Sequence, residues 1–175
     1  MTFTIAPIVE GHGDVAALPV LLRKISLEAQ VARPVRFPRT KLIQPDELRR
    51  AVQIARSNIR DQGLVLLVID GDEDCAGKLG PRLLAAMTDS NCGMPCFVAA
   101  AVREFEAWIV GGDPTYAVDS PDTAGDLKGR IRRRFGRYQE TVDQPRLSAA
   151  IDVERLKANS KSFNRLARRV EQMRS

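Results

Sequence analysis

The sequence contains a single histidine, His12, and only three cysteines, Cys75, Cys92 and Cys96. One histidine gives no basis for a serine–histidine–aspartate triad. Three cysteines form no disulfide framework, because their number is small and odd. Cys92 and Cys96 lack a second pair of ligands for structural zinc, so we expect them to be buried or near-surface thiols.

Long apolar runs are also missing. No stretch approaches the roughly 20 apolar residues that cross a bilayer. The N-terminal segment MTFTIAPIVEGHGD lacks the basic start and the long apolar centre of a signal peptide. We therefore expect a cytoplasmic protein with no membrane partner. With 175 residues, 44% of them apolar and 28% charged, the chain can form one domain, 1–175, with a sizeable core.

Two familiar loop motifs fail on their spacing. Segment 70–81 begins with the acid spacing of a calcium-binding loop, but cysteine and proline stand where that loop needs glycine and glutamate. Gly77-Lys78 has neither the spacing nor the following serine or threonine of a P-loop. The spacing thus excludes a calcium-binding loop of this type and P-loop nucleotide binding.

Positive charge is concentrated towards the C-terminus. The chain has 27 cations against 22 acids, and residues 101–175 account for 15 of the cations and 11 of the acids. The excess lies mainly in five arginines: Arg130, Arg132, Arg133, Arg134 and Arg137. Because guanidinium groups match phosphate geometry, these arginines are candidates for binding a nucleic-acid backbone. From composition alone, a solvated helix face is the simpler interpretation.

Strand and helix patterns alternate over residues 1–110, the predicted α/β core. They predict strand 3–9, helix 15–28, a weak strand 35–43, a helix from 45 to near 63, strand 64–69, a helix around 82–87 and strand 96–102. Six consecutive aliphatic residues at 64–69 indicate a central parallel strand. The order predicts an open, mostly parallel sheet flanked by helices. Pro7 suggests that the first strand is bent or lies at an edge.

Residues 111–175 have a different character. Their first part is rich in loops, and helical spacing returns at 151–173. We interpret this part as a helical C-terminal extension that packs on the sheet within the same domain.

Acidic residues follow three of the predicted strands. Glu10 follows the first, the run Asp70 to Asp74 follows the third, and Glu104 and Glu106 follow the fourth. The carboxyl ends of parallel strands meet at one edge, so these acids should line one crevice, provided that the last strand continues to residue 106. Carboxylates that lie close together repel one another unless they are protonated or bind a metal. The pattern therefore predicts a Mg²⁺ or Mn²⁺ site with one or two ions.

The same segments resemble known motifs. Residues 10–14, EGHGD, resemble the EGxxD motif of the TOPRIM domain, which primases, topoisomerases and several small nucleases share. Residues 70–77 resemble the DGDxAG segment of primases with two extra residues. REFEAW at 103–108 and SKSF at 160–163 resemble a prokaryotic TOPRIM-like family, domain-of-unknown-function family 4276, over nearly the whole chain.

This resemblance implies an active site that breaks or joins phosphodiester bonds. Glu10 would be the general acid/base and a possible metal ligand, and Asp70 and Asp72 would bind magnesium. Asp14 matches the last acid of EGxxD, although it could equally cap the helix that follows. The longer acidic loop leaves open which two of its four acids bind metal.

Weaker candidates complete the predicted site. Asp74, Glu104 and Glu106 are possible further metal ligands. Lys161 is similar to an electrostatic helper of the overcoming-lysogenization-defect nucleases. His12 could contact a phosphate, or it could be an ordinary polar loop residue.

The larger enzymes that contain a TOPRIM domain do not fit this chain. Topoisomerases need a nucleophilic tyrosine on gate domains, and primases need a zinc module; 175 residues leave no room for either. The leading hypothesis is a Mg²⁺- or Mn²⁺-dependent nuclease that acts on DNA or RNA. The alternatives are a non-catalytic subunit that docks on a partner, such as an ATPase by analogy, and a phosphatase that acts on a small phosphoester.

Overall fold

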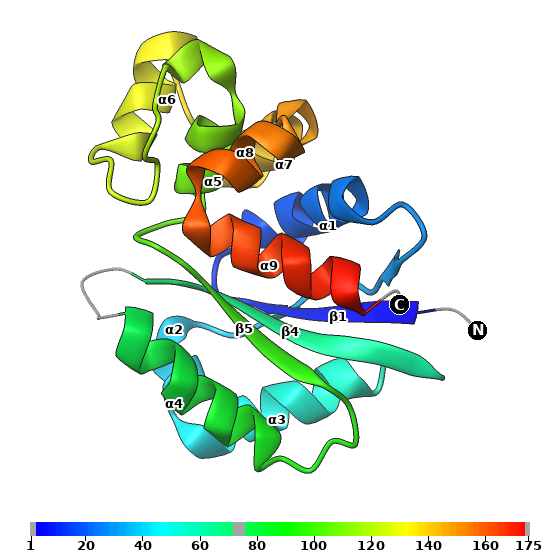
Figure 1. Ribbon diagram of the computed structural model, residues 1–175. Coiled ribbons are helices and arrows are strands. Elements are labelled where there is room, and N and C mark those ends of the chain that lie inside the picture. The colour runs from blue at the N-terminus through cyan, green and yellow to red at the C-terminus, as the bar shows by residue number, and fades with distance from the viewer. Residues whose placement is uncertain (1–2, 72–75, 174–175) are drawn as a thin grey trace.

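The computed structural model describes residues 3–71 and 76–173 (Figure 1). Its strands form a single sheet in the order β2-β1-β4-β5, and β3 pairs with β1 beside β2. Every pairing is parallel. The strands are β1 (Phe3–Val9), β2 (Gln30–Val31), β3 (Val35–Arg36), β4 (Gln62–Asp70) and β5 (Cys96–Ala101). The predicted α/β class, with a parallel sheet between helices, is confirmed.

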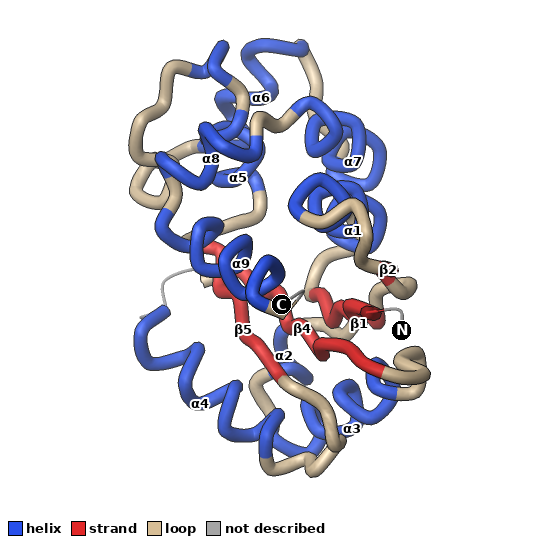
Figure 2. The backbone as a smooth tube through the Cα atoms, turned by 45° about the vertical axis from the view of Figure 1, so that its right-hand side comes forward, coloured by secondary structure: helices blue, strands red, loops and turns tan. Residues whose placement is uncertain are grey.

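Helices cover both faces of this sheet. In Figure 1, α1 and α9 lie above the sheet and α2, α3 and α4 lie below it, while the remaining helices gather beyond α1 (Figures 1 and 2). The helices are α1 (Asp14–Ile25), α2 (Arg39–Leu42), α3 (Pro45–Arg56), α4 (Ala76–Thr88), α5 (Glu106–Gly112), α6 (Leu127–Phe135), α7 (Glu140–Ala150), α8 (Val153–Asn159) and α9 (Lys161–Gln172). No helix within the described residues is long and apolar enough to cross a bilayer.

Strand β4 is the centre of the hydrophobic core. Its residues 64–69 are all 2% exposed or less, as six consecutive aliphatic side chains predict. Alternate side chains enter two separate clusters. Leu64, Leu66 and Val68 pack with α1 and α9, whereas Val65, Leu67 and Ile69 pack with α3 and α4. The sheet thus separates two cores, and β4 contributes to both.

Pro7 lies within an inner strand, so the expectation of a bend or an edge is wrong. β1 pairs with β4 along its whole length and with β2 and β3 on its other side. The carbonyls of Ile5 and Val9 accept hydrogen bonds from that other side, which places Pro7 on the same side. Since Pro7 falls in the interval between β2 and β3, its missing N–H leaves no ladder bond unmade.

The predicted strand 35–43 is also wrong beyond Arg36. The chain leaves the sheet and turns at Pro38, which has extended backbone angles and precedes α2. Proline has no N–H to continue a ladder, and its fixed φ suits the start of a helix. The helical spacing at 151–173 proves to belong to two helices, because Ser160 is extended and its hydroxyl caps α9 by accepting a hydrogen bond from the Phe163 N–H.

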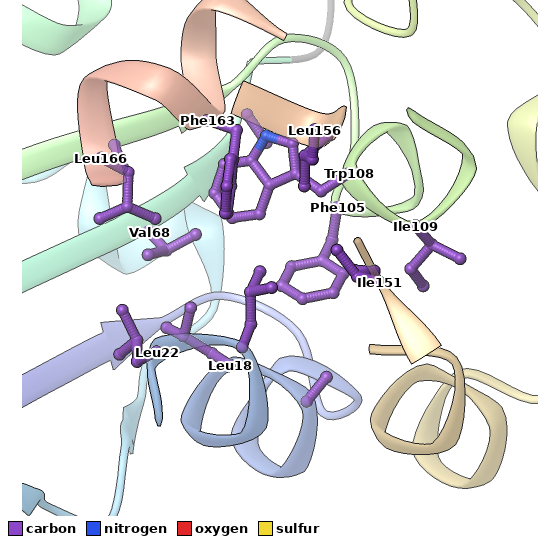
Figure 3. Packing of buried hydrophobic residues seen from close by; sticks show 14 of the residues in the cluster. Leu18, Leu22, Val68, Phe105, Trp108, Ile109, Ile151, Leu156, Phe163 and Leu166 are labelled. Atoms are coloured by element: carbon purple, nitrogen blue, oxygen red, sulfur yellow. The ribbon is translucent and has the colours of Figure 1, made fainter. Parts of the chain in front are cut away.

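Trp108 joins the helices above the sheet. Its ring is fully buried between Phe105 and Phe163, with centroid distances of 5.4 and 5.7 Å (Figure 3). The indole Nε1 donates a hydrogen bond of 3.0 Å to the Ser162 hydroxyl. This contact connects α5 with the first turn of α9.

Replacing Trp108 by alanine should therefore destabilise the protein strongly. We expect Trp108→Ala to lower the unfolding free energy by about 3–5 kcal/mol, because it leaves a large cavity between two other rings. Urea unfolding followed by circular dichroism measures this change. Leu27→Ala is the matched control, since Leu27 is 90% exposed and its truncation should change stability little. Equal stability of the Trp108 variant and the wild type would contradict the packing described.

Candidate functional site

Glu10 and Asp70 lie at the carboxyl ends of neighbouring strands. Glu10 directly follows β1, and Asp70 is the last residue of β4. Val9 pairs with Val68, so the two acids leave the sheet at nearly the same level. Asp70 in turn pairs with Ala101 at the end of β5. The structure thus places both acids at the edge of the sheet where open α/β proteins bind ligands.

Arg39 is a site residue that the sequence analysis missed. Its Nη1 lies 3.5 Å from Glu10 Oε2 and donates a hydrogen bond of 2.6 Å to the Asp70 backbone carbonyl. The guanidinium therefore ties the ends of β1 and β4 together. Arg39 was hidden because it falls within the segment predicted as a strand, and a single arginine there has no distinguishing pattern.

Asp14 is buried behind the loop that follows Glu10. Its Oδ2 accepts a 3.0 Å hydrogen bond from the Gly11 N–H, and its side chain does not cap α1. Burial raises the pKa of Asp14 to about 6, the Gly11 bond opposes this rise, and nearby Glu106 and Glu10 add to it. The carboxyl of Asp14 thus braces the loop, and His12 at the loop's tip is exposed.

Gly13 brings this loop into contact with α7. A Cβ at Gly13 would collide with the Gln144 side chain and would lie 3.0 Å from the Glu140 carbonyl carbon. Only glycine permits this close approach. This packing constraint is additional to the EGxxD motif, whose own glycine is Gly11.

Glu106 is almost fully buried, with 1% exposure, in a polar network beside the strand ends. Its Oε1 accepts hydrogen bonds from the Tyr138 hydroxyl at 2.6 Å and from Gln144 Nε2 at 3.2 Å. Burial, followed by the adjacent Glu106 carboxylate, raises the pKa of Tyr138 above its ordinary value. The Tyr138 hydroxyl therefore keeps its proton and donates a hydrogen bond to Glu106.

Lys128 supplies the positive charge of this network. Its Nζ lies 2.6 Å from Glu140, 3.5 Å from Glu104 and 3.9 Å from Glu106. Burial alone would lower the pKa of Lys128, but the three carboxylates, Glu140 first, outweigh burial and raise it. Burial, more than the Glu106 charge, raises the pKa of Glu104. A lysine ammonium thus offsets the repulsion for which the sequence suggested a metal.

The geometry favours some of the predicted metal ligands over others. The strand ends at Ala101 and Arg103 has a φ of 76°, so the expected continuation of the strand to residue 106 is wrong. Glu104 and Glu106 nevertheless lie together beside Lys128, and Oε1 of Glu106 already accepts hydrogen bonds from Tyr138 and Gln144. Asp72 and Asp74 lie outside the described residues. Within the described residues, no group of three His, Cys, Asp or Glu side chains is placed to hold a metal ion.

The predicted cationic residues lie in two other places. Lys161 is exposed on the first turn of α9. The arginine cluster belongs to α6 and the turn after it, at the end of the helical group away from the sheet (Figures 1 and 2). Arg133 pairs with Asp126 at 2.8 Å, and Arg134 stacks over the Tyr116 ring.

The segments REFEAW and SKSF meet in the folded protein. Trp108 of the first segment donates to Ser162 of the second, and both serines of SKSF bind Asp122. The Asp122 carboxylate accepts hydrogen bonds from the Ser160 hydroxyl at 2.7 Å, the Ser162 hydroxyl at 3.0 Å and the Ser162 N–H at 3.1 Å. Asp122 is not predicted from the sequence, because no local spacing relates it to residues 160–162.

The fold and these strand-end carboxylates define an α/β protein with a negatively charged candidate site at the carboxyl edge of a parallel sheet. The family model described as "Domain of unknown function (DUF4276)" matches residues 9–171, and the chain belongs to this family. The comparisons with curated proteins and with solved structures gave no match.

The raised pKa of Asp14 predicts a pH-dependent stability. A carboxyl whose pKa rises from 3.8 to about 6 on folding favours the folded state below pH 4, and this contribution is lost as the pH rises through 6. The wild type should lose about 3 kcal/mol of unfolding free energy over that interval relative to Asp14→Asn. Urea unfolding at several pH values tests this. The exposed-site variant Asp119→Asn should follow the wild type, and an Asp14→Asn curve parallel to the wild type would contradict the prediction.

Proposed function

We propose that this protein is a Mg²⁺- or Mn²⁺-dependent nuclease that cleaves phosphodiester bonds in DNA or RNA. The observation that carries the proposal is the position of Glu10 and Asp70 at the ends of adjacent parallel strands, with Arg39 between them. The resemblance of their sequence contexts to the EGxxD and DGD segments of TOPRIM domains supports the same chemistry. The proposal includes a cytoplasmic location, where a prokaryotic nuclease meets its substrate.

Glu10 and Asp70 suit a hard divalent cation, because such ions prefer carboxylate oxygens. Asp72 and Asp74 join this set by resemblance alone. When bound, the ion would neutralise charge on the scissile phosphate and activate a water molecule. Glu10 would exchange a proton with the attacking water or the leaving oxygen, which is the role of a general acid/base.

Positive side chains would hold the substrate. The Arg39 guanidinium contacts Glu10, and a guanidinium is the side chain whose planar geometry matches phosphate oxygens. His12 is exposed in the loop next to Glu10, in reach of a substrate that enters there. Lys161 would serve as an electrostatic helper, and the arginines of α6 would bind more distant backbone phosphates.

Neutralising either acid should abolish cleavage. We expect Glu10→Gln and Asp70→Asn each to lower the cleavage rate at least about 100-fold while the unfolding midpoint stays close to that of the wild type. The assay incubates purified protein with plasmid, single-stranded DNA and RNA in Mg²⁺, Mn²⁺ or EDTA. Asp119→Asn is the matched control, since it removes an exposed carboxylate away from the strand ends.

Other outcomes of this assay favour other functions. Cleavage that survives in both variants would indicate a contaminating nuclease. No turnover with any metal would favour a non-catalytic subunit that docks on a partner such as an ATPase. Hydrolysis of a small phosphoester, with no cleavage of nucleic acid, would favour a phosphatase.

The arginine cluster should contribute to the salt dependence of nucleic-acid binding. Arg132 and Arg137 are exposed and form no hydrogen bond or salt bridge within the described residues, which leaves them available to phosphates. Replacing both by alanine should reduce the slope of log K against log salt by about 0.7–0.9 per lost phosphate contact. Fluorescence anisotropy with labelled DNA in EDTA measures this slope. A double variant of Arg50 and Arg60, exposed on the α3 side, is the control, and an equal loss there would contradict a specific role for α6.

A further inference from the structure

Strand β5 forms an open edge of the sheet. Among the described strands it pairs with β4 alone. Its six residues, CFVAAA, include no charged side chain and no proline, which are the usual means of preventing edge strands from pairing further. Such an edge is able to accept another extended chain.

The backbone of β5 presents unused hydrogen-bonding groups at this edge. The carbonyls of Pro95 and Ala101 face β4, since they accept hydrogen bonds from Val65 N–H at 3.0 Å and Gly71 N–H at 2.6 Å. The groups of successive residues alternate in direction along a strand, so those of Cys96, Val98 and Ala100 face away from β4. Three residues of β5 therefore offer both an N–H and a C=O to a neighbouring chain.

A cavity of about 480 Å³ lies along this outer edge. Its floor is β5 itself. Gly80, Pro81 and Leu84 of α4 form one wall, and Lys161, Ser162 and Arg165 of α9 form the other. Both ribbon views show β5 passing between α4 and α9, and no helix or strand of the described residues lies on its outer side (Figures 1 and 2). We call this cavity the β5 groove.

The α9 wall of the β5 groove is positively charged. Its lining residues include Lys161 and Arg165, whereas Gly80, Pro81 and Leu84 of the α4 wall carry no charge. Asp122 also lines the groove, but its carboxylate already accepts hydrogen bonds from Ser160 and Ser162. This charge favours an acidic occupant, and it disfavours a second copy of the chain, which would bring the same cations to the contact.

We propose that the β5 groove binds an extended acidic segment of a partner protein, which adds to the sheet as a strand beside β5. The alternating N–H and C=O groups match a peptide and give affinity, and the two α9 cations that line the groove, Lys161 and Arg165, select for acidic side chains. The apolar floor and the α4 wall suit the aliphatic side chains of such a segment. Lys161 is shared with the proposed cleavage site, but Arg165 and the backbone groups of β5 are not, so this binding does not depend on cleavage at Glu10 and Asp70.

A synthetic peptide tests the proposal directly. The probe is a labelled peptide of about eight residues in which glutamate and valine alternate, and its binding to the full chain is followed by fluorescence anisotropy. Two further peptides carry N-methyl groups, one on every valine and the other on every glutamate. Because only alternate N–H groups of an added strand face β5, one methylated peptide should bind at least about tenfold more weakly and the other about as well as the parent.

Variants of the protein locate the binding. Arg165→Glu should weaken the parent peptide at least about tenfold, whereas Arg168→Glu, on an exposed position of α9 outside the groove, should retain most of the affinity. Ala100→Pro removes an outward N–H without touching the ladder to β4 and should weaken binding in the same way. Circular dichroism confirms that each variant is folded.

Two results would overturn the proposal. One is that the parent peptide does not bind, and the other is that the two methylation patterns change the affinity equally. Single-stranded DNA could instead compete with the parent peptide while both methylated peptides bind as tightly as the parent. That result would make the groove a nucleic-acid site. A concentration-dependent dimer that Ala100→Pro abolishes would make the second copy the occupant.

Discussion

Burial of β4 between two helical layers determines where the other parts of this protein can lie. Its aliphatic side chains alternate between two cores, and its backbone pairs with β1 on one side and β5 on the other. Parallel pairing in this register forces the ends of β1 and β4 to the same edge. The proximity of Glu10 and Asp70 is thus a consequence of core packing, and Arg39 only adds a direct link between the two strand ends.

Charge near this edge is arranged in two distinct ways. Glu104 and Glu106 are held by Lys128, a lysine from α6, within a network that also includes Tyr138. Glu10 and Asp70 lie instead on the side where Arg39 and the exposed His12 are found. A buried network with its own cation acts as support for the loop and helices around it. We propose the acids at the strand ends as the divalent-cation site, because they lie at the carboxyl edge of the sheet, where open α/β proteins bind ligands.

Local pattern was sufficient for the parts of the fold that depend on burial. Residues 64–69 predicted a central strand because six aliphatic side chains need apolar surroundings on both faces, and the apolar run 3–9 placed Glu10 at the end of the first strand. Pattern failed where the cause lies elsewhere in the chain. Pro7 is tolerated only because β2 and β3 leave an interval beside it. Asp122 and Arg39 reach their partners through tertiary contacts that no spacing reveals.

The central claim is that Glu10 and Asp70, and not Glu104 and Glu106, form the divalent-cation site. The most direct measurement is a Mn²⁺ titration of the protein followed by electron paramagnetic resonance, with Glu10→Gln, Asp70→Asn and Glu104→Gln compared with the wild type. The account predicts that the first two variants bind Mn²⁺ at least about tenfold more weakly and that Glu104→Gln binds it like the wild type. Loss of binding in Glu104→Gln, with unchanged binding in the other two variants, would contradict it.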